Sequence, residues 1–393
     1  MTIRPISGEE RLDLAFPLQA YAFDRTPTGQ DPRERYRDRL PFVSGNYTLL
    51  AEEDGAAAAV ATAIPMRQNV RGQVLPMAGV AAVASHPLHR RRGHARALLL
   101  RLLGDMRDQG HAVSVLYPFR PSFYARFGFT GLPQHRKATF SPADLGELVR
   151  ADLPGEVRWR PVAEGFDDHR ALALRMAERL HGFAVFPDYR AAALRTEHKW
   201  LVTAHTEGEV VGALTYRIDE HMGDLTGDTL LCTGPLGRDL ILGFLGRHVD
   251  QVGRVVLGVL PSETPELWAT DLSVVTTSTV RVTASVAPMA RVLAMEALSG
   301  IAAGPAALTV EVPDDPFIAG TWHLDGTSGT LRVTRAAEPP AATLTPIALS
   351  ALVYGTLDPT EIALRGLGTV SPDAAAALRT LFPPASPFVW AQF

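Results

Sequence analysis

Apolar and polar residues in the first third of the chain alternate with the spacing of strands and then of a helix. Residues 2–23 predict a short strand followed by an amphipathic helix, with Ser7 as the cap of that helix. Residues 46–70 predict two strands joined by a turn at 54–55, which is the pattern of a hairpin. Small apolar residues at 75–86 predict a further strand. We therefore expect a mainly β region near the start of the chain.

A helical pattern follows these strands. From Gly93 onward, apolar side chains recur every three or four residues, which predicts a helix with one buried stripe. The stripe consists of Leu98, Leu99, Leu102, Leu103 and Met106. Gly110 can end the helix in a left-handed conformation, and residues 112–119 predict a buried strand. The order strand, glycine turn, helix and strand is that of a βαβ-like unit, which binds phosphate at its first turn.

The second third of the chain repeats this order weakly. Residues 228–261 predict a strand, a Gly/Pro turn, a helix and a strand, but this repeat lacks a run of arginines. A seam falls at 150–162, and beyond about Val286 short alternating segments and two helix-like segments predict an α+β region. The predicted domains are 1–150, 151–285 and 286–393.

Composition narrows the class of protein. A chain of 393 residues, 46% hydrophobic and 20% charged, suits two or three globular domains. The net charge of −4 gives no global reason to expect nucleic acid or an acidic membrane as partner. Without a signal pattern or an apolar stretch of roughly 20 residues, we expect a cytoplasmic protein. The single cysteine, Cys232, excludes an intramolecular disulfide, and its apolar surroundings favour a buried thiol over a nucleophile.

A basic stretch, HRRRGHARALL at 89–99, stands at the start of the predicted helix. Because a helix N-terminus already carries partial positive charge, arginines there are unfavourable unless an anion is bound. In the pattern Arg90-x-x-Gly93-x-Ala95, the glycine permits a tight turn, and successive backbone N–H groups can converge on a pyrophosphate. By itself the pattern also fits a solvated, basic helix start.

In its context this turn resembles that of the GNAT superfamily of N-acetyltransferases, which implies acetyl-CoA as the anion. The chain further resembles the enhanced intracellular survival (Eis) acetyltransferases. The resemblance rests on HRRRGHARALL, on FYARFGF about 30 residues later, on a second half without the turn, and on an end at FVWAQF. It implies an α/β and α+β fold: a catalytic GNAT domain (1–150), a degenerate GNAT-like domain (151–285) and a sterol-carrier-protein-like domain (286–393).

The resemblance also implies which residues contact acetyl-CoA. The backbone of 83–85 would pair with the pantetheine arm like an added strand, and the arginine turn would hold the pyrophosphate. The implied contacts are Val83, Ala84, Ser85, Arg90, Arg91, Arg92, Gly93, His94, Ala95, Arg96, Phe119 and Arg120. The last two are carried over although PFRPS departs from the small, acidic stretch usual in the family. We interpret His86 and His89 as turn residues and expect no metal.

Two groups are implied to catalyse the transfer. Tyr124 in FYARFGF matches the family's general acid, since a phenol can protonate a departing thiolate. Without the family, Tyr124 would be a packing aromatic. The family's general base is the terminal carboxylate, here that of Phe393, brought to the first domain by the third. The alternative is a chain end in solvent, but PFVWAQF is aromatic and apolar to its last residue.

The sequence says less about the binding site of the acceptor amine than about the acetyl-CoA site. Phe23, Asp24 and Met66 match the family's acceptor pocket, and Asp24 could hold an ammonium group or serve only as a helix-end charge. The resemblance implies an aminoglycoside, a polyamine or a lysine side chain as acceptor, and a homo-oligomer of up to six copies. A non-catalytic protein that binds acyl-CoA or lipid is the alternative function, because sterol-carrier domains can enclose apolar ligands.

Overall fold

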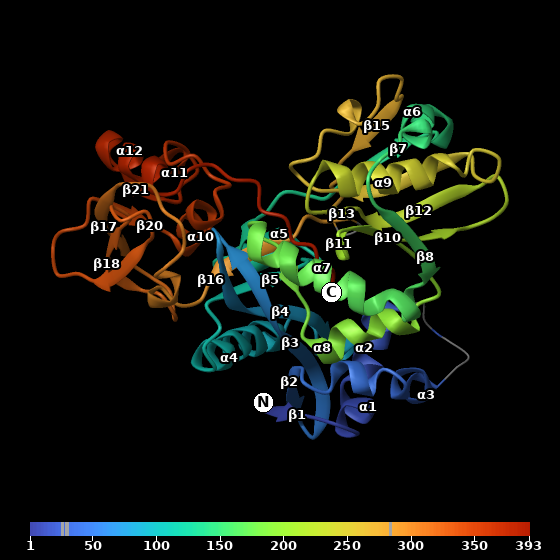
Figure 1. Cartoon of the computed structure of the whole chain (residues 1–393). Coiled ribbons are helices and arrows are strands. Elements are labelled where there is room, and N and C mark those ends of the chain that lie inside the picture. Colours follow the sequence, from blue (N-terminus) through green and yellow to red (C-terminus); the bar gives the residue numbers. More distant parts are fainter. Residues whose placement is uncertain (25–26, 28–30, 283–284) are drawn as a thin grey trace.

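The computed structural model describes residues 1–24, 27, 31–282 and 285–393, and folds them into three lobes, each built on one sheet (Figure 1). The first sheet has the order β1-β2-β3-β4-β5-β16-β6, with β9 paired to β3. Its strands are β1 (Thr2–Ile6), β2 (Tyr47–Glu53), β3 (Ala56–Val70), β4 (Gln73–Ser85), β5 (Val113–Leu116), β6 (Thr130–Gly131), β9 (Ala184–Val185) and β16 (Met289–Val292).

The predicted hairpin and βαβ-like unit of the first lobe are confirmed. Asp54 and Gly55 both have positive φ, at 53° and 78°, and join β2 to β3. Helix α4 (His94–Asp108) links the parallel strands β4 and β5, its leucine stripe is buried, and Gly110 follows it with φ of 91°. The local spacing of apolar residues therefore specified this unit correctly.

The first predicted helix is different in the structure. Two short helices, α1 (Glu10–Leu14) and α2 (Phe16–Phe23), replace it, because Pro17 has no N–H to continue the hydrogen bonding of α1. Ser7 does not cap either helix, since α1 begins after Glu9 and has no side-chain cap. A third helix, α3 (Pro32–Arg37), follows.

The second lobe confirms the weak repeat. Its sheet has the order β15-β7-β14-β12-β11-β10-β8, with β13 paired to β11. The strands and main helices are β7 (Arg136–Phe140), β8 (Glu156–Pro161), β10 (Trp200–Thr206), β11 (Glu209–Ile218), β12 (Asp224–Thr229), β13 (Leu231–Cys232), β14 (Arg254–Val259), β15 (Val274–Thr277), α7 (Val162–Arg179) and α9 (Pro235–Gly246). Strands β12 and β14 are parallel and connected through α9, as β4 and β5 are through α4. Cys232 is buried, as predicted.

The third lobe is the predicted α+β region. Its sheet has the order β19-β18-β17-β20-β21. The elements are β17 (Ala307–Val312), β18 (Gly320–Asp325), β19 (Arg332–Arg335), β20 (Ala342–Leu344), β21 (Gly368–Val370), α10 (Pro346–Tyr354), α11 (Glu361–Leu364) and α12 (Pro372–Leu381). Across the described residues, no helix combines the length and apolar character needed to cross a membrane.

The three sheets do not coincide with the segments 1–150, 151–285 and 286–393. Strand β7 falls within the first segment but joins the second sheet, where it pairs with β14 and β15. Strand β16 falls within the third segment but joins the first sheet, between β5 and β6. After β6 the chain thus returns to the first sheet at the short strand β9 and again, about 160 residues after β6, at β16, so the lobes are interlaced.

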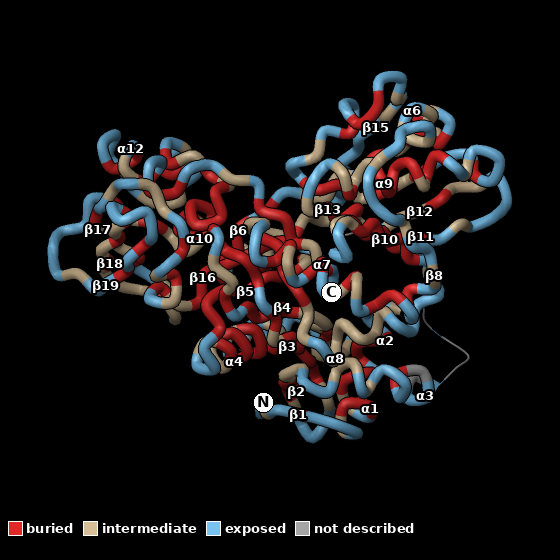
Figure 2. The backbone as a smooth tube through the Cα atoms, viewed as in Figure 1, coloured by how far each residue is buried: buried red, intermediate tan, exposed pale blue. Residues whose placement is uncertain are grey.

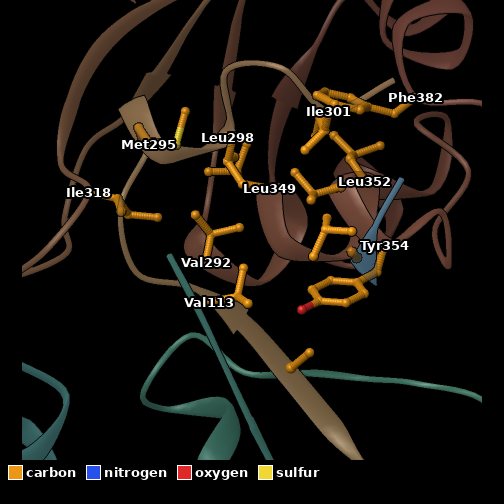
Figure 3. Close-up of a cluster of buried hydrophobic side chains, with 14 of the residues drawn as sticks. Val113, Val292, Met295, Leu298, Ile301, Ile318, Leu349, Leu352, Tyr354 and Phe382 are labelled. Atoms are coloured by element: carbon orange, nitrogen blue, oxygen red, sulfur yellow. The ribbon is translucent and has the colours of Figure 1, made fainter. Parts of the chain in front are cut away.

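A continuous apolar core joins the first and third lobes (Figure 2). It extends from β4 and β5 through β16 to α10, as the close-up in Figure 3 shows for Val113, Val292, Met295, Leu298, Ile301, Ile318, Leu349, Leu352, Tyr354 and Phe382. Arg291 of β16 is 1% exposed and pairs with Asp315 of the third lobe. The two lobes therefore share one core.

Candidate active site

The first sheet opens between its two parallel strands. β4 and β5 pair only as far as Val80 and Leu116. Beyond this point Ala82 has a left-handed φ of 51°, and the register between β4 and β3 shifts, so β4 bulges away from β5. Ala84 and Ser85 keep their pairing with β3, but the other edge of residues 83–85 pairs with no strand in the described part of the chain. This edge can hydrogen-bond an extended ligand as an added strand would.

The arginine turn lies directly after this open edge. A short 3-10 turn, η2 (Pro87–His89), leads into it, and α4 begins at His94. Arg91 and Gly93 have left-handed φ values of 62° and 89°, so the backbone folds back on itself before the helix. The first N–H groups of α4 have no partner within the helix and can bind an anion. The turn's exposed residues are Arg90, Arg91, Arg92, Gly93 and Arg96, whereas Ala95 is half-buried.

A carboxylate from a different strand holds the turn in place. Glu53 Oε2 lies 2.7 Å from His89 Nδ1, 2.9 Å from Arg92 Nη1 and 3.2 Å from the Nε2 of buried His94. The hydrogen bond with His89 is the main reason that the pKa of Glu53 is lowered to about 2. The donor atoms of Glu53, His89 and His94 lie within 4.8 Å of one another, but a cation there would have to displace Arg92 from the same oxygen.

Tyr124 lies on α5 (Pro121–Ala125), which follows the open end of β5. It is 3% exposed and belongs to the apolar cluster that includes Val80 and Leu116, the last paired residues of β4 and β5. Burial raises the pKa of Tyr124, so its hydroxyl stays protonated at neutral pH. Phe119 covers it, with ring centroids 5.5 Å apart, and is itself 49% exposed.

The end of the chain lies against the opposite face of β4, in the centre of the molecule (Figure 1). A Cβ atom on Gly79 would stand 3.1 Å from the Phe393 ring and 2.7 Å from Met66 Sδ, so only glycine fits there without a shift of these side chains. The Phe393 ring also contacts the rings of Tyr117 and Phe186, with centroids 5.6 Å and 6.2 Å apart. Two implied site residues, Met66 and Phe393, thus come together beside β4.

Hydrogen bonds from the first lobe hold the last residues of the chain. The Tyr117 hydroxyl lies 3.2 Å and 3.3 Å from the carbonyl oxygens of Val389 and Ala391. His135 Nε2 lies 2.7 Å from the Val389 oxygen, and its Nδ1 lies 3.0 Å from Gln392 Nε2. His135 therefore donates from Nε2 and accepts at Nδ1, which defines its tautomer.

The second lobe supports the same tail from the other side. The Phe388 N–H donates to the His181 carbonyl at 2.9 Å, and the Trp390 ring stacks on Phe183 with centroids 5.1 Å apart. Gly182 permits this approach, because a Cβ atom there would lie 2.4 Å from the Phe388 nitrogen. Residues 388–393, which we call the tail, are thus held by the first and second lobes. The residues that hold the tail by hydrogen bonds and ring stacking were not predicted from the sequence.

Not all the implied acceptor residues join this site. Phe23 ends α2 and is 60% exposed, and Asp24 accepts a hydrogen bond from the Tyr36 hydroxyl at 2.7 Å. Arg120 is exposed at the start of α5.

Known domain families match both ends of the chain. Residues 2–131 match the acetyltransferase (GNAT) domain, and residues 292–390 match the sterol carrier protein domain. An uncharacterized N-acetyltransferase of Streptomyces coelicolor is 26% identical over 362 residues, 83% of each chain. One of Streptomyces avermitilis is 26% identical over 237 residues, and this match spans 56% of each chain. The N-acetyltransferase Eis of Mycobacterium tuberculosis is 42% identical over 65 residues, 16% of each chain.

Solved structures share the whole fold. A GCN5-related N-acetyltransferase from Kribbella flavida is 25% identical, with a TM-score of 0.81 over 100% of this chain and 98% of its own. Eis1 from Mycobacterium abscessus is 20% identical, with a TM-score of 0.78 over the full length of both chains. The predicted fold class is confirmed, and the chain is a homologue of N-acetyltransferases with a GNAT domain and a C-terminal sterol carrier protein domain.

Proposed function

We propose that this homologue of the Eis-type GNAT N-acetyltransferases transfers an acetyl group from acetyl-CoA to a primary amine. One observation carries the proposal: β4 contacts the Phe393 ring at Gly79, has an edge at 83–85 that is unpaired within the described chain, and leads directly into the arginine turn. The open edge suits the extended amide chain of a pantetheine diphosphate, and the arginine turn suits its pyrophosphate. The terminal carboxylate of Phe393 would suit an amine that must lose protons.

Acetyl-CoA would bind along residues already placed. The backbone of 83–85 would pair with the pantetheine amides, and the N–H groups of Gly93, His94 and Ala95 would face the pyrophosphate at the start of α4. Exposed arginines around the turn would neutralise the phosphates. These arginines are Arg90, Arg91, Arg92 and Arg96. Phe119 and Arg120, exposed at the start of α5, would line the path between the two strands.

The transfer balances with two protein groups. The neutral amine attacks the thioester carbonyl carbon, a C–N bond forms and the C–S bond breaks. The attacking nitrogen releases a proton, and the departing thiolate takes the proton of the Tyr124 hydroxyl, which solvent then restores. The products are an amide and free CoA thiol. Tyr124 suits this role because burial keeps its hydroxyl protonated.

The carboxylate of Phe393 would act on the acceptor side. The Phe393 ring lies beside Gly79 of β4, and the negative charge of the carboxylate would attract and orient an ammonium group. A carboxyl group with an ordinary pKa near 3.5 is a weak base toward an amine, so the proton must leave through water rather than by a single direct transfer. Aminoglycosides, polyamines and lysine side chains all present such an amine.

Release of CoA thiol in the presence of an acceptor tests this proposal. We expect Tyr124→Phe, and a chain extended by several residues past Phe393, each to lower kcat more than tenfold with little change in acetyl-CoA binding. Tyr47→Phe is the matched control, because it removes a tyrosine hydroxyl that hydrogen-bonds Asp105 far from the tail. Unchanged turnover in both variants would refute the assigned roles, and binding without release for every acceptor would favour an acyl-CoA sensor.

A further inference from the structure

A cavity of about 520 Å³ lies where the first and second sheets meet, beside the end of the chain. We call it the junction cavity. Its walls come from the residues after β5, the segment that crosses from β6 to β7, the segment after β15, and the tail. They are Tyr117, Pro118, Gln134, His135, Lys137, Thr277, Thr279, Ser285, Val286 and Gln392. Its volume is that of a site for a small molecule.

Two walls of the junction cavity continue into the candidate active site. Gln392 is bonded to Phe393, so the wall that it forms lies one residue from the end of the chain. Tyr117 follows Leu116, where β4 and β5 separate, and its ring packs against the Phe393 ring. The cavity therefore lies near the end of the chain, which carries the proposed base, and near the point where β4 and β5 separate.

The charge of the junction cavity is unusual for a site that would receive a polycation. None of its lining residues among those described is acidic, and its one full charge is Lys137. Lys137 is exposed and forms no ion pair within the described chain. Burial lowers the pKa of His135, and the charge of Lys137 adds to the effect, so this imidazole is neutral at pH 7.

The remaining polar groups divide into those that hold the wall and those that face a ligand. The Gln134 amide donates to the Thr279 carbonyl at 3.1 Å and to the Ser285 hydroxyl at 3.3 Å, so it holds these two residues against its own segment. The exposed hydroxyls of Thr277 and Thr279 lie on this wall and can bond hydroxyl groups or an anion.

We propose that the junction cavity binds the acetyl acceptor and selects an amine on a neutral, hydroxyl-rich body or on a body with an anionic group. This rests on the proposed function and narrows its acceptor class. Only the reacting nitrogen then carries positive charge, and it meets the terminal carboxylate. A second ammonium group would meet Lys137 without a nearby lining carboxylate to offset the repulsion.

An acceptor series tests the selection. We compare glucosamine, 6-aminohexanoate and spermidine, which carry a hydroxylated body, an anionic group and additional positive charges. The first two should have kcat/KM at least tenfold above spermidine, which corresponds to about 1.4 kcal/mol. Lys137→Glu should shift this ratio about tenfold toward spermidine. Lys199→Gln is the matched control, because Lys199 is the one other lysine and pairs with Glu197 and Asp228 in the second lobe.

Lysine labelling tests occupancy of the cavity without catalysis. The acetylated products N-acetylglucosamine and 6-acetamidohexanoate have no amine to consume an amine-reactive label. At saturating concentration they should slow labelling of Lys137 several-fold, measured by peptide mass spectrometry, and leave Lys199 unchanged. Protection of Lys137 without turnover of any acceptor would refute the proposed function but support the cavity as a ligand site.

Two results would overturn the inference. Spermidine as the preferred acceptor, with a ratio that Lys137→Glu does not change, would exclude charge selection by Lys137. Equal labelling of Lys137 with and without both products would exclude binding in the junction cavity. Loss of folding in Lys137→Glu would be detected by circular dichroism, and Lys137→Gln would then replace it with an expected shift about half as large on the logarithmic scale.

Discussion

The side chain of Glu53 shows how a single residue can organise a binding turn. Arg91, Arg92 and Gly93 must adopt a folded-back path although three arginines in succession repel one another. Glu53 lies at the end of β2, and one of its carboxylate oxygens contacts His89, Arg92 and His94. The negative charge of this carboxylate compensates the repulsion among the arginines. This role of Glu53 could not be predicted from the sequence, because Glu53 lies 36 residues before His89 and has no local signal of its own.

Replacement of Glu53 by glutamine should therefore loosen the turn without touching the reacting groups. We expect KM for acetyl-CoA to rise about fivefold and kcat to change less than twofold, since a neutral amide attracts the Arg92 guanidinium less strongly and accepts weaker hydrogen bonds than a carboxylate. Initial rates at varied acetyl-CoA measure this. Glu52→Gln serves as control, because Glu52 pairs with Arg4 instead. An unchanged KM in Glu53→Gln would show that the turn keeps its path unaided.

The pKa of Tyr124 makes a prediction about pH. A general acid must be protonated, and burial raises the pKa of Tyr124 above its ordinary value of about 10, so the active form persists to higher pH. We expect kcat/KM to rise with pH as the acceptor amine loses its proton, and to show no fall below about pH 10. Rates from pH 6 to 10, with stability checked at each pH, measure this. A fall between pH 8 and 9 would contradict the role of Tyr124.

At the scale of elements, the tail 388–393 has no regular secondary structure, and its position depends on other elements. Tyr117 and His135 hold it through the carbonyl oxygens of Val389 and Ala391, which would place the terminal carboxylate. These bonds do not depend on the side chains of the tail. Hydrogen bonds to backbone carbonyl groups leave no pattern in the sequence of the tail. Its aromatic residues predicted only that the end of the chain is buried.

Loss of this hold should free the end of the chain. We expect carboxypeptidase A to release Phe393 at least tenfold faster from the double variant Tyr117→Phe, His135→Ala, because both hydrogen bonds to Val389 are lost. The kcat of this variant should fall while KM for acetyl-CoA stays within twofold. His135→Gln, whose amide can still donate, should restore part of the protection, and Tyr47→Phe should behave as the parent. Equal release from all variants would contradict the positioning role.

Elements with a local period could be predicted from the sequence, and contacts between distant segments could not. The leucine stripe of α4 and the turn at 54–55 depend on neighbours within a few residues, and both are confirmed. The place of β16 beside β5 depends on pairing with a segment about 170 residues earlier, which no local pattern encodes. The opening between β4 and β5 was implied only by the family resemblance, because a missing hydrogen-bond partner is also non-local.

For the whole molecule, the hairpin between β3 and β4 is the point where all three lobes meet. Arg71 at its tip is 9% exposed and donates to the carbonyl oxygens of Leu352, Val353 and Pro383 in the third lobe. Its own N–H donates to His181 of the second lobe at 3.0 Å. This hairpin carries β4 and hence the open edge, so the stability of the lobe contacts and the geometry of the site are coupled.

Arg71→Met tests this coupling. The variant keeps most of the side-chain volume but leaves carbonyl groups of α10 without their donor, so we expect a loss of about 3 kcal/mol in the free energy of unfolding. Arg365→Met, which removes an exposed pair with Glu361, should cost less than about 0.5 kcal/mol. Urea unfolding followed by tryptophan fluorescence and by circular dichroism measures both.

The number of unfolding transitions in Arg71→Met shows what joins the first and third lobes. Because the first and third lobes share one apolar core, they should still unfold together, and the two probes should give one midpoint, lower than that of the parent. Two separated transitions would show that Arg71, rather than the shared core, joins the lobes. A midpoint equal to that of Arg365→Met would show that the hairpin tip contributes nothing to their union, and that the open edge of β4 is held by the first sheet alone.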